Sequence, residues 1–232
     1  MFGIVELRRY RTHPGRRDDL AALFEREFIE SQVACGMMPI GQYRNLDDPD
    51  MFVWLRGFSD MTTRLRALTA FYRESQAWRD HRGAANETMI DSDDVLLLRP
   101  ARPDTGFDLA GFERPGHDAV EAPNGYVAAL ILLLRHAPAQ DVIAEFEASL
   151  LPQLRAHAGR VATFVSTGEV NDFPALPVRD EPALVAVGAC PTAYDLAVWS
   201  EAAGATFPAT LQSYVVASET LRLAPYRRSL YR

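Results

Sequence analysis

Charged, polar and aromatic side chains occupy every second position in three short stretches of the N-terminal half. In "VELRRY", "PIGQYRN" and "MFVWLRG" these residues are Glu6, Arg8, Tyr10, Gln42, Arg44, Phe52, Trp54 and Arg56. Successive side chains of a β-strand point to opposite faces, so three strands would bring these residues onto one face of a sheet. Arginines gathered there could bind a carboxylate, enolate or phenolate, and the aromatic rings could hold a flat molecule. The alternative is a sheet face that is open to solvent and carries cross-strand ion pairs.

A second group of candidates lies in "FYRESQAWRDHRG", residues 71–83, which we expect to be helical. Tyr72 and Trp78 are candidate ligand-binding residues. His81 is the candidate catalytic acid or base, because its reference pKa is about 6.5, and Glu6 is the other group that could accept a proton. The alternative is that the aromatic residues are core, since aromatic stripes at helical spacing are usually buried. His81 would then be a surface residue or a cation at a helix C-terminus.

Composition excludes several classes of protein. The chain of 232 residues has a formal net charge of −7, which argues against a nucleic-acid surface. It contains no lysine, so neither a lysine Schiff base nor a standard P-loop is available. The 5 histidines and 2 cysteines show no metal-binding spacing, and we expect neither a metal nor a cofactor. The longest apolar run is too short to span a membrane and charges follow the N-terminus closely, so we expect a cytoplasmic protein.

The elements that would position these residues are arranged as a repeat. "VELRRYRTHPGRRDDLAALFEREF" and "LILLLRHAPAQDVIAEFEASLLPQL" both predict a strand, a turn with proline and an amphipathic helix. "MFVWLRGFSDMTTRLRAL" and "ALVAVGACPTAYDLAVW" both predict a strand followed by a helix. The helices would begin at Ser59-Asp60 and at the capping box Thr192 to Asp195. Each half therefore reads β-α-β-β-α-β, the ferredoxin-like motif of an α+β protein. We expect one domain at 1–100, a linker at 101–124 and a second domain at 125–232.

Two such sheets could cover each other and form a barrel. "YVAALILLLR" is apolar on both faces, as expected for a strand buried on both sides. We expect the polar and aromatic set to point into the barrel, and Val5, Leu7 and their neighbours to pack on the helices. The matching second-half residues, Ala183, Val185 and Val187, are apolar. The first half should therefore carry any site.

The stretches "VELRRYRTHPG", "FVWLRGFSD" followed by "RLRAL" from Arg64, "FYRESQAWRDHR", "DSDDVLLLRP" and "LRLAPYRRSL" together resemble the NIPSNAP family. That family lies within the dimeric α/β-barrel superfamily, which includes antibiotic-biosynthesis monooxygenases. The resemblance implies a ferredoxin-like fold, with the barrel formed within a chain, between chains or both. Together with the strand that is apolar on both faces, it leads us to expect a homodimer or larger assembly. Relatives of the fold include cofactor-free oxygenases, isomerases and haem-binding enzymes, and some NIPSNAP relatives look like adaptor proteins.

Three functions follow from these observations. The first is small-molecule binding, with cofactor-free oxygenase or isomerase chemistry on a flat anionic or enolisable compound. The second is a non-catalytic adaptor, for which we expect a plugged barrel and an exposed apolar patch. The third is haem binding, with His81, His136 or His157 as the axial ligand. No nucleic-acid or membrane partner is expected.

Overall fold

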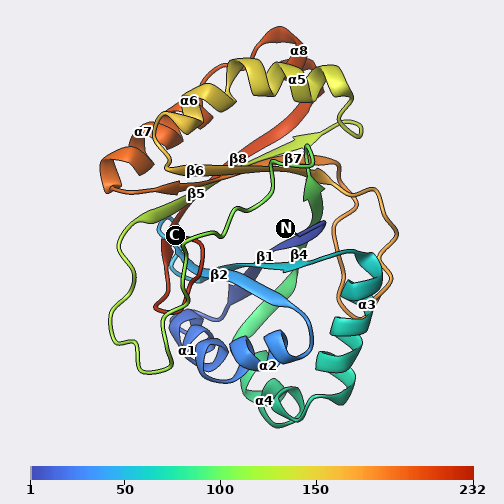
Figure 1. Cartoon of the computed structure of the whole chain (residues 1–232), viewed down its shortest axis with the longest axis vertical. Helices are drawn as coiled ribbons and strands as arrows, with labels where there is room; N and C mark the ends of the chain where they lie inside the picture. The colour runs from blue at the N-terminus through green and yellow to red at the C-terminus, as the bar shows by residue number, and fades with distance from the viewer. Residues whose placement is uncertain (1) are drawn as a thin grey trace.

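The computed structural model describes residues 2–232, which form a mixed α/β barrel with helices on two opposite sides (Figure 1). The elements of the first half are β1 (Ile4–Thr12), α1 (Arg17–Leu23), η1 (Phe24–Phe28), α2 (Ile29–Ala34), β2 (Met38–Asn45), β3 (Met51–Phe58), α3 (Met61–Thr69), η2 (Ala70–Glu74), α4 (Gln76–Asn86) and β4 (Met89–Pro100). Those of the second half are β5 (Tyr126–Leu134), α5 (Gln140–Ser149), α6 (Leu151–Arg155), β6 (Arg160–Ser166), β7 (Ala183–Cys190), α7 (Ala193–Ala203), α8 (Ala209–Tyr214) and β8 (Val215–Pro225). The described residues 101–125 between the halves contain no helix or strand.

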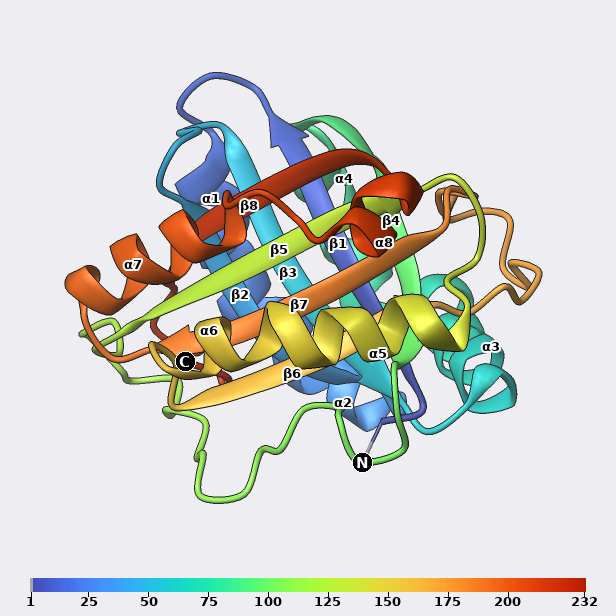
Figure 2. The ribbon, with the colours of Figure 1, turned by 90° about the horizontal axis from the view of Figure 1, so that it is seen from above.

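The strands close into one antiparallel barrel in the order β1-β3-β2-β8-β5-β7-β6-β4. Each half has the same internal order, namely fourth, first, third and second strand. The halves join where Tyr43–Asn45 pairs with Leu223–Pro225 and where Leu98–Pro100 pairs with Phe164–Ser166. Figure 2 shows the strands of one half crossing those of the other. The expected closure of the sheets into a barrel is confirmed, and this barrel closes within one chain.

Apolar side chains from both halves fill the interior of the barrel. Val5 and Val53 from the first half meet Ile131 and Val185 from the second, and Phe107 from the connecting segment joins them. All five are buried. Strand β5 is buried on both faces, as its sequence predicts, because its alternate residues pack in the barrel and under the second-half helices.

The sequence-based assignment of the strand faces is wrong. Val5 and Leu7 point into the barrel, whereas Glu6, Arg8 and Tyr10 lie on the opposite face, toward the first-half helices. A closed interior shared by two sheets offers charged groups neither water nor partners, so burying them there would be costly. The helix-facing side supplies partners for these charges, as shown below.

The comparison between halves changes with this correction. Ala183, Val185 and Val187 face the barrel interior, so they do not correspond to the polar and aromatic set. The helix-facing residues of the second half include Ala128, Leu130, Leu132, Leu184 and Ala186, all of them apolar. The chemical asymmetry between the halves therefore persists, but it lies in the layers between sheet and helices.

Both predicted helix starts are confirmed. The Asp60 side chain accepts a hydrogen bond from the Thr63 backbone N–H at 2.6 Å, which caps α3. Thr192 and Asp195 form the reciprocal capping box of α7. The cap on α3 matters for the site, because α3 carries Arg64.

Residues 71–83, which we expected to form one helical segment, are divided. The π-helical turn η2 ends at Glu74, Ser75 is extended with a ψ of 134°, and α4 begins at Gln76. A second π-helical turn, η1, interrupts the first helix. Such turns occur frequently at functional sites. No helix of residues 2–232 is both long and apolar enough to cross a membrane.

Candidate functional site

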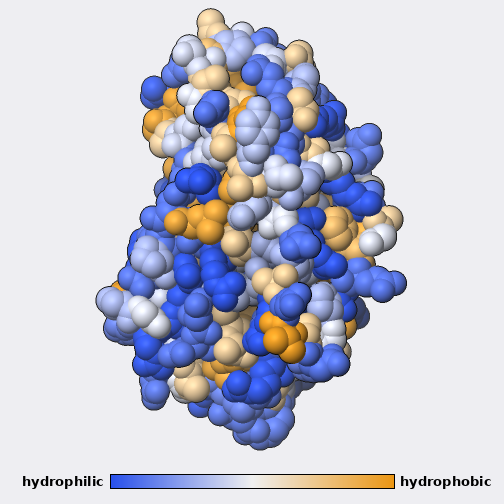
Figure 3. Space-filling model, turned by 90° about the vertical axis from the view of Figure 1, so that its left-hand side faces the viewer, coloured by the Kyte–Doolittle hydropathy of each residue, from blue (hydrophilic) through white to orange (hydrophobic). Residues whose placement is uncertain are grey.

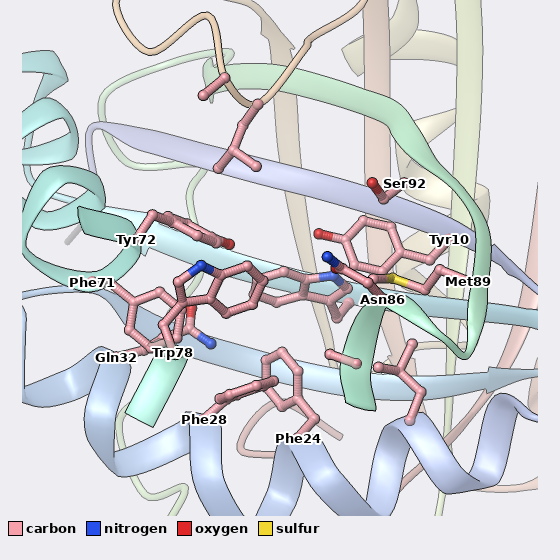
Figure 4. A pocket seen from close by; sticks show the side chains of 15 residues that line it. Tyr10, Phe24, Phe28, Gln32, Phe71, Tyr72, Trp78, Asn86, Met89 and Ser92 are labelled. Atoms are coloured by element: carbon pink, nitrogen blue, oxygen red, sulfur yellow. The ribbon is translucent and has the colours of Figure 1, made fainter. Parts of the chain in front are cut away.

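A cavity of about 240 Å³ lies between the first-half sheet and its helices (Figure 4). It is therefore outside the barrel, in the layer where the polar strand residues point. Its wall is made by Tyr10, Leu20, Phe24, Phe28, Gln32, Trp54, Phe71, Tyr72, Trp78, Ala85, Asn86, Met89, Ser92, Ala175 and Leu176. The last two come from the loop between β6 and β7, so both halves of the chain contribute to the wall.

The two π-helical turns supply the aromatic side of the cavity. Phe24 and Phe28 come from η1, and Phe71 and Tyr72 come from η2. Phe24 meets Trp54 edge to face with ring centroids 4.8 Å apart. Figure 4 shows Trp78, Phe71, Phe28 and Phe24 surrounding one side of the space. Rings packed in this way form a rigid apolar surface that suits a flat molecule.

A buried ion cluster lies behind the opposite wall. Glu6 on β1 is fully buried and its carboxylate lies 2.7 Å from Arg8, from Arg56 and from Arg64. Burial acts to raise the pKa of Glu6, but the charges of Arg56, Arg8 and Arg64 outweigh it and hold the pKa far below its ordinary value. Arg64 also lies 2.5 Å from Asp172. Three arginines thus face two carboxylates, which leaves one positive charge in excess.

Two of these arginines hold tyrosine hydroxyls at the cavity. Arg8 Nε donates to the Tyr10 hydroxyl at 2.7 Å, and Arg56 Nη1 donates to the Tyr72 hydroxyl at 3.2 Å. A hydroxyl that accepts from an arginine keeps its own proton available to donate elsewhere. Burial raises the pKa of Tyr10 although the charge of Arg8 opposes this, so the side chain remains a neutral donor. In Figure 4 both hydroxyls point into the same space.

Several buried polar atoms beside these hydroxyls have no hydrogen-bond partner within residues 2–232. Trp54 Nε1 and Gln32 Oε1 belong to residues of the cavity wall. Arg8 Nη2 and both amide atoms of Gln42 also lack a partner. Arg8, Trp54 and Gln42 are cross-strand neighbours on β1, β3 and β2, so these atoms lie in one row of the sheet. Buried polar groups are normally paired, so these atoms require a partner such as ordered water, an ion or a polar ligand.

Most of the site residues proposed from sequence come together here. Tyr10, Trp54, Tyr72 and Trp78 line the cavity. Glu6, Arg8, Arg56 and Gln42 lie behind it, and all four are fully buried. Phe52 packs next to Tyr10, with ring centroids 6.4 Å apart, and supports the wall without lining it.

Two of the proposed residues lie elsewhere. His81 is half-buried on α4, its Nε2 is 3.4 Å from Glu27, and it does not line the cavity. Arg44 stacks on the ring of Tyr226 at 3.9 Å and pairs with Asp18. Their positions therefore give no support for a role at this cavity. Glu6 is also a poor proton acceptor at neutral pH, because its pKa is strongly lowered.

Sequence reasoning missed Gln32, Arg64 and Asp172. The first two are polar residues within helices, where an exposed position is the ordinary expectation. The sequence offered one signal for Arg64, because the predicted cap at Asp60 places this residue near the start of the helix that became α3. Asp172 lies in a loop whose path the sequence does not specify, and no local pattern could have placed it beside the first half.

The family model of NIPSNAP matches residues 5–103. No curated protein matches the chain. Two similar solved structures are candidate monooxygenases. The one from Lactobacillus acidophilus NCFM has a TM-score of 0.55 and 12% identity, and the match covers 97% of this chain and 94% of that chain. The one from Fusobacterium nucleatum subsp. nucleatum ATCC 25586 has a TM-score of 0.58 and 7% identity, and the match covers 96% of this chain and 91% of that chain. An anthrone oxidase-like protein has a TM-score of 0.56, 12% identity and coverages of 96% and 91%. These structures share the fold with this chain, and the similarity to NIPSNAP lies in its first half.

Proposed function

We propose that the cavity between the first-half sheet and helices binds a flat phenol or enolisable carbonyl compound as its anion. The observation that supports this most directly is the pair of tyrosine hydroxyls, each of which accepts a hydrogen bond from a buried arginine. Two hydroxyl donors of fixed orientation, with positive charge behind them, stabilise an oxyanion better than they stabilise the neutral ligand.

The size of the cavity limits the ligand to one or two rings. An engineered apolar cavity of about 150 Å³ holds benzene. The present cavity of about 240 Å³ would hold a substituted benzene or a compact bicyclic compound. Aromatic side chains on two sides would contact its faces, while Tyr10 and Tyr72 would receive its oxygen.

The proton of the ligand would go to water. Among the described residues that line the cavity there is no carboxylate and no imidazole. A side-chain base is unnecessary for a phenol or an acidic enol if the site lowers the pKa of the bound compound. The excess positive charge of the cluster of Glu6, Arg8, Arg56, Arg64 and Asp172 would have this effect.

The chemistry that suits such an anion is cofactor-free oxygenation or isomerisation. An enolate can give an electron to dioxygen and recombine with the resulting superoxide to a hydroperoxide after taking up a proton. The hydroperoxide forms at the carbon beside the carbonyl, which is a CH₂ group in the neutral ligand. Loss of water then converts this carbon to a ketone, so that one oxygen atom enters the product and the other leaves as water. The shared fold with candidate monooxygenases supports this proposal by analogy of fold alone.

Absorbance titration with 4-nitrophenol tests the binding step, because ionisation of this compound changes its visible spectrum. We expect the protein to bind it as the phenolate at a pH where most free compound is protonated. Replacing Tyr10 by Phe keeps the ring and removes the donor. Loss of a hydrogen bond to a charged group costs about 1.5–3 kcal/mol, so Kd should rise about ten- to a hundredfold.

Tyr194→Phe is the matched control, since Tyr194 lies in the second half and its side chain is 72% exposed. It should leave both Kd and the spectrum of the bound compound unchanged. Binding of the neutral phenol with equal affinity to all three proteins would contradict the proposal. Oxygen uptake with an enolisable bicyclic ketone would then separate an oxygenase from a protein that only binds.

The second candidate is a non-catalytic adaptor. The apolar side chains that fill the barrel favour it, because a plugged barrel is what we expect of an adaptor. On the face shown in Figure 3, apolar residues form small separate groups among hydrophilic ones, whereas an adaptor surface would need a continuous patch. Haem has no comparable support, because His81, His136 and His157 are not in the described wall of the cavity.

We further infer that the chain consists of two ferredoxin-like units, at 1–100 and 125–232, with the linker at 101–124. The identical strand order of the two halves supports this division. A homodimer or larger assembly and a cytoplasmic location remain proposals that follow from the family resemblance and from the composition.

A further inference from the structure

The loop at residues 167–182 belongs to the second half but packs on the first. It connects β6 to β7, and in Figure 1 it descends beside α3. Phe173 is buried in the apolar layer under the first-half helices, and its ring centroid lies 6.0 Å from that of Tyr72. Ala175 and Leu176 form part of the cavity wall. This loop therefore covers the candidate site from outside.

Backbone hydrogen bonds to β4 hold the two ends of the loop. Thr167 N donates to Leu97 O at 3.0 Å, and Arg179 N donates to Val95 O at 2.8 Å. A second cavity of about 630 Å³ has a wall that consists largely of residues of this loop and also includes Leu97 and Arg99 of β4. The loop is thus packed against the site at Phe173, Ala175 and Leu176 but incompletely packed beside β4, as is typical of segments that open locally.

Between these ends, Arg64 on α3 binds the loop. Its Nη1 lies 2.5 Å from Asp172 Oδ1 and its Nη2 donates to Asn171 Oδ1 at 3.2 Å. Its Nε donates to Glu6 Oε1 at 2.7 Å. One buried guanidinium is therefore shared between the loop and the ion cluster.

The same cluster continues to both cavity hydroxyls. Glu6 Oε2 accepts from Arg8 and from Arg56, each at 2.7 Å. These arginines donate to Tyr10 and Tyr72. An unbroken chain of charge-assisted hydrogen bonds thus runs from Asp172 to the two donors of the candidate site. If Asp172 leaves, the whole charge of Arg64 acts on Glu6 and weakens the hold of Glu6 on the other two arginines.

We propose that residues 167–182 are a lid supplied by the second half, and that Asp172 is a positioning residue that couples lid closure to the orientation of Tyr10 and Tyr72. This inference rests on the proposed ligand site. Coupling of this kind is reciprocal, so a ligand held by the hydroxyls favours the closed lid as much as the closed lid favours the ligand.

Asp172→Asn tests the coupling, because it removes the charge and keeps the shape. Hydrogen exchange of the backbone amides at 169–178, measured without ligand, reports the lid. Titration with 4-nitrophenol reports the affinity of the site and the fraction of bound phenolate. We expect Asp172→Asn to speed exchange in the lid and to raise Kd about five- to fiftyfold, although Asp172 does not line the cavity. The fraction of bound phenolate should fall even though the cluster gains net positive charge, because Tyr10 and Tyr72 line the cavity and would contact the ligand directly, whereas Arg64 does not line it.

Asp180→Asn is the matched control, since Asp180 lies in the same loop, is exposed and has no ion-pair partner within residues 2–232. It should leave exchange and binding unchanged. Asp172→Glu keeps the charge and should therefore keep the wild-type fraction of phenolate. If Asp172 were important only for the shape of the loop, this longer side chain would not preserve that fraction. If Asp172→Asn fails to fold, Asn171→Ala removes the other loop residue that accepts from Arg64 and should act in the same direction with a smaller effect.

The outcomes are distinct. Unchanged exchange in Asp172→Asn overturns the lid. Faster exchange with unchanged Kd and unchanged phenolate fraction overturns the coupling. If the wild-type protein does not bind 4-nitrophenol, the proposed function fails and so does the coupling to it, while the exchange data still decide whether Asp172 closes the loop.

Discussion

At the scale of single residues, Glu6 determines the character of the site. Its carboxylate lies 2.7 Å from each of three fully buried guanidinium groups. Removing one partner from such a cluster leaves charges that are buried and uncompensated, which is strongly destabilising. The cluster therefore stabilises the first half only as a whole, and its net positive charge is available to a ligand.

Replacing Glu6 by Gln should lower the free energy of unfolding by about 3–5 kcal/mol. Urea denaturation measures this loss. Glu181→Gln is the control, because Glu181 pairs with Arg179 at the surface and such pairs contribute about 1 kcal/mol or less. Equal losses in the two variants would show that the cluster has no special role.

The pH dependence of stability follows from the lowered pKa of Glu6. A carboxylate whose pKa is lower in the folded than in the unfolded state stabilises the protein above its ordinary pKa of 4.5, and this contribution is lost as the pH falls. Urea unfolding of the wild type at several pH values between 7 and 3 should show the free energy falling most steeply below about 4.5. The Glu6→Gln variant should show a shallower fall over the same interval.

At the scale of elements, the two faces of each first-half strand have different functions. One face fills the barrel and the other holds the ion cluster and cavity. The alternation of "VELRRY" and "MFVWLRG" allowed the two sets of residues to be separated from the sequence. Which set faced the barrel could not be read, because amphipathic helices and a second apolar sheet are both suitable covers for an apolar face. The π-helical turns were equally hidden, since no glycine or proline marks them.

Replacing Phe164 by Ala distinguishes the packing of the barrel from ligand binding at the cavity. Phe164 on β6 is fully buried in the barrel, and large-to-small changes at such positions cost about 3–5 kcal/mol. The cavity lies on the other side of the sheet, so the Kd for 4-nitrophenol should stay within about twofold of the wild-type value. Parallel urea denaturation and titration measure both effects. A large change in Kd without loss of stability would place the ligand inside the barrel.

At the scale of the whole molecule, the second half completes the first. The double-sided burial of β5 and the helix caps were predictable from local patterns. The crossing of the loop at 167–182 onto the first half was not, because contacts between segments so far apart leave no local periodicity.

The expected homo-oligomer rested partly on β5, but both faces of β5 are buried within this chain. The family resemblance is therefore its remaining support, and light scattering against the chain mass of 25.8 kDa tests it.

Residues 1–103 expressed alone should dimerise. The isolated first half would expose Val5, Leu7, Val53 and Leu55, which the second half covers in the barrel. A second copy presents the same apolar face and could close a barrel in its place. Light scattering and urea denaturation at several concentrations should show a dimer whose stability rises with concentration. A stable monomeric fragment would contradict this expectation.

The seam between β2 and β8 has a consequence for synthesis on the ribosome. β2 ends at Asn45, but its partner β8 begins at Val215 and reaches Pro225. Translation at about 5–20 residues per second leaves an interval of about 6 to 25 s between the end of β4 and the completion of β8. Throughout that interval the nascent chain presents an apolar sheet with no cover. Its yield in cells should therefore depend on chaperone capacity and on the speed of translation through the second half.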